Sequence, residues 1–215
     1  MASQFIHITL PDGTRKQVPA GCTVREALTP EGGRLDAKVL AAKINGEPRD
    51  LSCPLEQDAT IEPLTFESAE GREVYRHSST HIMAQAVKEV FPTAQLTIGP
   101  ALDDGFYYDF AFDRPFTPED LEKIEARAIE IMKRGLTVTR SELSKQDAIK
   151  FFQERGEGYK VELINSFDDA SPISLYRQGE FVDLCRGPHL PTTGYVGAFK
   201  LLSTGGAYWR GDERN

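Results

Sequence analysis

The sequence contains two pairs of residues whose side chains could activate a water molecule or bind a metal ion. His77 and His81 lie four residues apart in a stretch of helical periodicity, so their side chains project from one helix face. Cys185 and His189 are also four residues apart, but the Gly-Pro dipeptide between them favours a loop. Imidazole titrates near neutral pH and can accept a proton, and histidine and cysteine are also zinc ligands. The pairs therefore predict either a hydrolytic centre or a closed, structural zinc site.

The neighbours of these residues argue against two other chemistries. A zinc-protease motif needs glutamate directly after its first histidine, whereas Ser78 follows His77. A nucleophilic cysteine needs surroundings that favour the thiolate, and nothing near Cys185 in the sequence provides them. We therefore expect Cys185 to be a pocket residue.

The first 65 residues have the pattern of a small β-grasp unit. Residues 3–10 alternate between apolar and polar types, which indicates a strand, and a tight turn at Asp12-Gly13 lets residues 14–18 return as its partner. Thr23 and Glu26 form a capping box, which predicts a short helix. Further strands are expected at residues 41–44, from residue 47, and at residues 59–66. This order predicts a ubiquitin-like fold for residues 1–65.

Residues 66–215 predict a larger α+β unit with antiparallel sheet, beginning with a polar linker at residues 67–71. A helix over residues 73–91 would carry both histidines of the first pair. Thr117 and Ser144 have the character of N-caps, which predicts helices over residues 117–134 and from residue 144 to about residue 156. Short strands are expected at residues 95–98, 105–112, 136–140, 159–164, 173–176, 180–184, 198–202 and 207–209.

The overall composition is that of a soluble protein. Hydrophobic residues make up 40% of the chain and charged residues 27%, and no apolar run approaches the roughly 20 residues of a membrane helix. Three scattered cysteines do not form a disulfide framework, and the first residues do not resemble a signal peptide. These observations predict a cytoplasmic protein. The net charge of −8 argues against a protein whose main task is to grip nucleic acid, because phosphate binding needs a basic surface.

Five motifs in a fixed order resemble the second domain of bacterial threonyl-tRNA synthetases, which is similar in outline to the editing domain of alanyl-tRNA synthetases. Residues 1–65 resemble the TGS module that precedes this domain. The resemblance covers essentially the whole chain. The aminoacylation core and the anticodon-binding domain of the family are absent, so we expect neither ligation nor ATP binding from these residues. The motifs are His77-Ser-Ser-Thr-His81, Gly105-Phe-Tyr-Tyr-Asp-Phe110, Tyr159-Lys160, Asp183-Leu-Cys-Arg-Gly-Pro-His189 and Gly205-Gly-Ala-Tyr-Trp-Arg-Gly-Asp212.

The resemblance implies an editing function, namely hydrolysis of serine wrongly attached to threonine tRNA. Serine lacks one methyl group of threonine, and a pocket gains only ~1–3 kcal/mol of discrimination from a group of that size. A second site that hydrolyses the smaller product solves this problem. The substrate is the ester between the amino acid and the terminal ribose of the tRNA.

The resemblance also suggests roles for individual residues. Hydrolysis needs an activated water, a stabilised oxyanion and a positioned leaving group. We expect His77 to act as the base, with His81, Lys160 and Asp183 completing the catalytic group. Lys160 would stabilise negative charge or hold the tRNA end, and Asp183 would orient a water, a histidine or the substrate ammonium. The remaining expectations are a substrate pocket formed by Tyr108, Cys185 and His189, and a tRNA contact at Arg186.

Two rival functions and one cofactor question stay open at this stage. The threonyl branch is understood to work with waters, whereas alanyl relatives are understood to bind a metal, so no cofactor is favoured and zinc at His77, His81, Cys185 and His189 is the alternative. The chain could then be a non-catalytic module that contacts tRNA and holds a structural zinc. A freestanding deacylase is the other rival. Expected partners are the 3′ end of serylated tRNA(Thr) and the remainder of the synthetase, with no membrane, and the fragment is expected to be a monomer.

Overall fold

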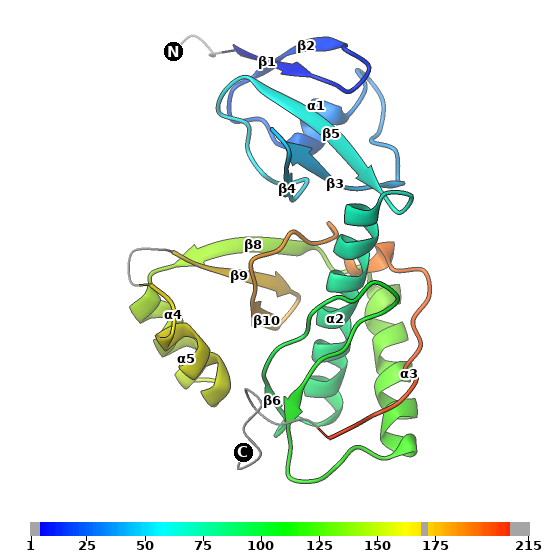
Figure 1. The fold of residues 1–215 in the computed structure, drawn as a ribbon, viewed down its shortest axis with the longest axis vertical. Helices are drawn as coiled ribbons and strands as arrows, with labels where there is room; N and C mark the ends of the chain where they lie inside the picture. The colour runs from blue at the N-terminus through cyan, green and yellow to red at the C-terminus, as the bar shows by residue number, and fades with distance from the viewer. Residues whose placement is uncertain (1–4, 169–171, 207–215) are drawn as a thin grey trace.

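The computed structural model describes residues 5–168 and 172–206. Figure 1 shows a small sheet domain at one end, and a long central helix that leads from it into a larger domain. The predicted strand at residues 207–209, and most of the motif at residues 205–212, lie outside the described residues.

The first domain is a five-stranded sheet with one short helix, α1 (Val24–Leu28). The strand order is β2-β1-β5-β3-β4, in which only β1 and β5 pair in parallel. Thr23 and Glu26 form the expected capping box at the start of α1. The predicted β-grasp fold is confirmed. Its strands are β1 (Phe5–Thr9), β2 (Arg15–Pro19), β3 (Val39–Ile44), β4 (Glu47–Arg49) and β5 (Ala59–Thr65).

Helix α2 (Ala69–Val90) begins three residues after β5 and links the two domains. Ser68 caps it, accepting a hydrogen bond from the backbone N–H of Gly71. Residue 71 must be small, because a Cβ there would lie 1.8 Å from the carbonyl oxygen of Thr65. Leu40 and Leu64 of the first domain belong to the same apolar core as Val74 and Ile82 of α2. The two domains therefore share one continuous core.

The second domain combines this helix with a three-stranded sheet and further helices. Helix α3 (Pro118–Arg134) packs along α2 (Figure 1). The sheet order is β10-β9-β8, and both pairings are antiparallel, as expected. Its strands are β8 (Val138–Leu143), β9 (Ile173–Gln178) and β10 (Phe181–Leu184). The remaining elements are β6 (Gln95–Leu96), β7 (Phe110–Ala111), α4 (Lys145–Gln153), α5 (Gly158–Asn165) and the 3₁₀ turn η1 (Thr193–Tyr195).

Three strand predictions in this domain are wrong. Residues 159–164 form helix α5, in which Lys160 and Ile164, four residues apart, are both buried. The buried lysine interrupts the apolar pattern, which makes the segment resemble an alternating strand. The strand expected at residues 105–112 is only two residues long, Phe110–Ala111, and residues 198–202 form no regular element.

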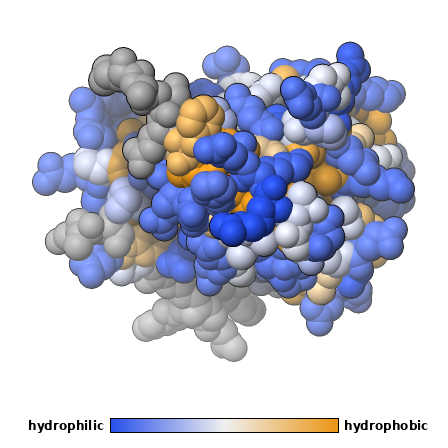
Figure 2. Space-filling view, turned by 90° about the horizontal axis from the view of Figure 1, so that it is seen from above, coloured by the Kyte–Doolittle hydropathy of each residue, from blue (hydrophilic) through white to orange (hydrophobic). Residues whose placement is uncertain are grey.

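The face on the side of the first domain is largely polar. Seen from the end that carries the first domain, hydrophilic side chains dominate and apolar ones show in smaller areas (Figure 2). Within residues 5–168 and 172–206, no helix has both the length and the apolar character needed to cross a membrane.

Candidate functional site

The two pairs predicted from the sequence meet at one place. Helix α2 carries His77 and His81 one turn apart, and the loop that follows β10 carries Cys185 and His189. The metal-binding atoms of all four side chains lie within 4.8 Å of one another. The sulfur of Cys185 lies 3.2 Å from His77 Nε2 and 3.1 Å from His189 Nε2. These four residues are called the His-Cys cluster below.

Ser78, which the sequence analysis did not select, determines the tautomer of one imidazole. Its single hydroxyl hydrogen is donated to the carbonyl oxygen of Val74 at 2.8 Å. The contact of 3.1 Å between Ser78 Oγ and His189 Nδ1 must therefore have the imidazole N–H as its donor. This assignment leaves His189 Nε2 with a lone pair that faces Cys185, so the thiol S–H donates to it.

A buried charged group borders the His-Cys cluster. Lys160 Nζ on α5 lies 2.6 Å from Asp183 Oδ1 on β10. Tyr108 donates its hydroxyl to Asp183 Oδ2 at 2.7 Å and accepts a hydrogen bond of 3.0 Å from Lys160. His81 Nε2 lies 3.8 Å from the same carboxylate. Lys160 and Asp183 are only 2% and 1% exposed, so the ion pair is screened very little by solvent.

The ionisation states of this charged group follow from its contacts. Burial is the largest single influence and would raise the pKa of Asp183, but the Lys160 charge, His81 and the hydrogen bonds from Lys160 and Tyr108 together outweigh it, so the net shift is downward. Burial and the neighbouring Asp183 charge raise the pKa of Tyr108 well above its ordinary value. At neutral pH Asp183 is therefore a carboxylate and Tyr108 a neutral phenol that donates its proton.

The three histidines of the His-Cys cluster are neutral at the same pH. Burial lowers the pKa of His77, lowers that of His81 to about 3, and lowers that of His189 well below its ordinary value. A neutral imidazole has one nitrogen that can accept a proton. His77 is the one member of the three that is only partly buried, so it can reach solvent within the cavity.

Cys185 is a thiol and not a thiolate. Burial raises its pKa to about 12, and the Asp183 charge adds to the shift, although the N–H of Gly187 opposes it. The thiolate is the reactive form of cysteine. A buried neutral thiol is poorly suited to act as a nucleophile.

A cavity of about 650 Å³ opens onto both groups of residues. All the site residues predicted from the sequence line this cavity except His189. His189 contacts the sulfur of Cys185, which does line it. Gly99, which the sequence analysis missed, lines the cavity beside Tyr108, where a Cβ would lie 2.2 Å from the phenol ring. In the sequence, Gly99 is followed directly by Pro100, and this dipeptide predicts a loop but not a cavity wall.

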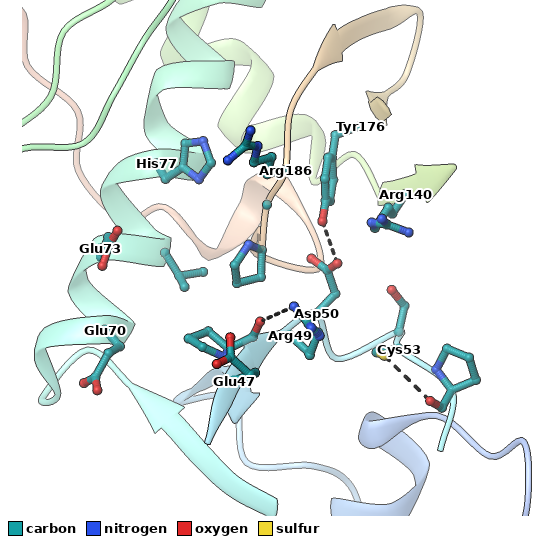
Figure 3. A pocket seen from close by; sticks show the side chains of 16 residues that line it. Glu47, Arg49, Asp50, Cys53, Glu70, Glu73, His77, Arg140, Tyr176 and Arg186 are labelled. Carbon is teal, nitrogen blue, oxygen red and sulfur yellow. Dashed lines mark hydrogen bonds between the residues drawn. The ribbon is translucent and has the colours of Figure 1, made fainter. Parts of the chain in front are cut away.

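A second cavity, of about 670 Å³, lies between the two domains. Figure 3 shows that the loop after β4 of the first domain faces His77 and Arg186 across it. His77 and Arg186 line both cavities, so the His-Cys cluster lies between them. Arg186, predicted as a tRNA contact, is therefore at the rim of the candidate site.

The His-Cys cluster has the donor set of a zinc site. Three imidazoles and one thiol are common zinc ligands, and a ligating histidine usually donates its other nitrogen to a second group. His189 makes such a bond to Ser78. Zinc held by all four residues would have a closed coordination shell, which is typical of a structural ion.

Comparison with known families covers both ends of the chain. The TGS domain family matches residues 6–65. The family described as the threonyl and alanyl tRNA synthetase second additional domain matches residues 173–215, which include Asp183, Cys185 and His189.

Full-length relatives are similar over nearly the whole chain. A threonine--tRNA ligase of Symbiobacterium thermophilum is 54% identical over 99% of this chain and 33% of its own length. Two further threonine--tRNA ligases, from Acidithiobacillus ferrooxidans and a Geobacter species, are each 53% identical over 97% of the chain, which spans 32% and 33% of them. The chain thus spans about one third of the length of these relatives.

Proposed function

Because this chain carries a TGS domain and the second additional domain of threonyl and alanyl tRNA synthetases, we propose that it hydrolyses the ester that joins serine to threonine tRNA. In a longer protein it would work beside the ligating part of the synthetase. The observation that carries the proposal is the pairing of a buried Lys160–Asp183 ion pair with neutral imidazoles in one cavity. Buried, perturbed ionisable groups in a cavity are typical of catalytic sites.

His77 is proposed as the group that takes a proton from the attacking water. It is neutral, lines the cavity and is more accessible than the other two imidazoles. A positioned base accelerates such a step by about 100-fold to 10,000-fold. His81 lies closer to the Asp183 carboxylate and would orient the water.

Lys160 is proposed to stabilise the negative charge that develops on the carbonyl oxygen of the ester. Its bonds to Asp183 and Tyr108 use two of its three N–H donors, so the third can be offered to the substrate. The two partners also hold the ammonium in place before the substrate arrives. A preorganised donor of this kind is among the largest contributions to catalysis.

Selectivity for serine would come from the limited space beside the amino-acid side chain near the ester. The extra methyl of threonine would crowd the water or tilt the ester carbonyl away from it, and small misplacements slow such reactions greatly. Arg186 at the rim is proposed to contact the phosphate of the tRNA end.

Zinc in the His-Cys cluster is the second candidate, and the 4.8 Å grouping of four ligand atoms favours it. The ion would be held by His77, His81, Cys185 and His189, and it would supply rigidity to the loop after β10. Under that alternative the chain is a tRNA-contact module without hydrolytic activity.

One experiment separates the two candidates. The purified chain is incubated with seryl-tRNA(Thr) and with threonyl-tRNA(Thr), each with and without a chelator, and its metal content is measured. We expect hydrolysis of the seryl ester that survives chelation and is much slower for the threonyl ester. One zinc per chain with no hydrolysis would overturn the proposal in favour of the structural module.

A further inference from the structure

A carboxylate of the first domain reaches the functional loop of the second. Asp50, which follows β4, accepts a hydrogen bond from the backbone N–H of His189 at 2.8 Å with Oδ1. Its other oxygen accepts the hydroxyl of Tyr176 at 2.7 Å (Figure 3). Hydrogen bonds to a charged acceptor are stronger than those between neutral groups. A single side chain of the first domain therefore holds two elements of the second.

Tyr176 and the loop are also packed against each other. The ring of Tyr176 meets the imidazole of His189 edge to face, with centroids 4.5 Å apart. Gly187 lies so close that a Cβ there would be 1.9 Å from the Tyr176 hydroxyl oxygen. The N–H of Gly187 in turn donates to the sulfur of Cys185. Asp50, Tyr176 and the loop thus form one set of contacts that ends at the thiol.

The first domain can hold this position because it is firmly attached to α2. The two domains share the core formed by Leu40, Leu64 and Val74. Lys43 of β3 also pairs with Glu70 in the first turn of α2 at 2.5 Å. The domain that carries Asp50 and the helix that carries His77 are therefore joined by apolar packing and by an ion pair.

We propose that Asp50 is a positioning residue for the hydrolytic site, through which the β-grasp domain sets the place of His189 and Cys185 against α2. The inference rests on the proposed hydrolysis for its effect on activity. Its structural part, the tethering of the loop after β10, can be measured without any substrate.

The test compares Asp50→Ala, Asp50→Asn and Tyr176→Phe with the parent chain. Alkylation of Cys185 by iodoacetamide, located by mass spectrometry, reports how often the loop opens. Hydrolysis of seryl-tRNA(Thr) reports the site itself. Asp58→Ala is the matched control, since Asp58 also accepts a backbone N–H, that of His7 at 2.8 Å, but within the first domain.

We expect Asp50→Ala to alkylate about tenfold faster at Cys185 and to hydrolyse at least about tenfold more slowly, as loss of a charge-assisted hydrogen bond implies. Asp50→Asn keeps one acceptor and should recover much of both properties, and Tyr176→Phe, which keeps the ring, should lie between. Asp58→Ala should match the parent. Unchanged alkylation in folded Asp50→Ala would overturn the inference, as would full hydrolysis by that variant. A parent chain without hydrolysis would refute the proposed function, while alkylation would still test the tether.

Discussion

The Lys160 ammonium and the Asp183 carboxylate lie 2.6 Å apart in the interior, one on helix α5 and the other on strand β10. Burying a charge without a partner costs far more than burying the pair. The two residues therefore depend on each other for stability as well as for any catalytic role, and variants must separate these effects.

Lys160→Met should abolish most hydrolysis and destabilise the fold. Removing one partner of a buried pair costs about 3–5 kcal/mol, and loss of an oxyanion donor slows catalysis by about 100-fold or more. The double variant with Asp183→Asn should regain stability in chemical denaturation but not activity. Lys200→Met, which removes an exposed pair with Glu125, is the control and should change little. Full activity in the double variant would exclude Lys160 as a catalytic residue.

His77→Ala should lose hydrolysis by about 100-fold or more while the fold remains intact, because a positioned base contributes at least that much. The rate of seryl-tRNA(Thr) deacylation under single-turnover conditions measures the effect. His7→Ala is the matched control, since His7 lies on β1 beside Asp58 and outside the site. If the rate is retained, another group takes the proton, and His81 becomes the first alternative.

Gly99→Ala should displace Tyr108 and impair the site. The added methyl would meet the phenol ring at 2.2 Å, and that ring carries the hydroxyl held between Lys160 and Asp183. Overpacking of this kind costs about 1–3 kcal/mol. Gly105→Ala is the control in the same connection, because a Cβ there meets nothing within 4 Å. Equal melting temperatures and rates for the two variants would contradict the prediction.

The fold should lose stability in acid through His81. Burial lowers the pKa of His81 to about 3, whereas in the unfolded chain this histidine has its ordinary pKa of 6.5. The unfolded state therefore binds more protons between these limits, so the stability present above pH 6.5 is lost as the pH falls toward 3. For chelator-treated protein we expect a loss of about 3 kcal/mol from pH 7 to pH 4, measured by urea unfolding. In His81→Gln the pH dependence should be clearly smaller, and an equal slope would argue against this origin.

Local sequence signals predicted the framework well. The capping box at Thr23, the N-cap at Thr117 and the turn at Asp12-Gly13 are determined by neighbouring residues, and the structure has the corresponding elements. Such features need no knowledge of distant contacts. That the two four-residue pairs belong to one site was implied by the resemblance of the five motifs to a known domain, and not by their spacing.

The features that the sequence did not predict depend on long-range packing. Lys160 can be buried because Asp183 and Tyr108 bind its ammonium group. In the sequence the buried lysine makes the segment resemble an alternating strand, although the segment forms helix α5. Ser78 and Asp50 are ordinary polar residues whose partners are 111 and 139 positions away. Nothing in their residue types distinguishes them from surface residues.

The direct passage from β5 into α2 has a practical consequence for anyone who wishes to recombine these domains. A cut at residue 65 would separate Leu40 and Leu64 from Val74 and expose that side of α2 to solvent. The same core continues from α2 to Ile124 and Ile131 of α3, so the two domains should be exchanged together and not separately. A hybrid protein joined within residues 66–68 would pair a first domain and an α2 whose contacting side chains do not match.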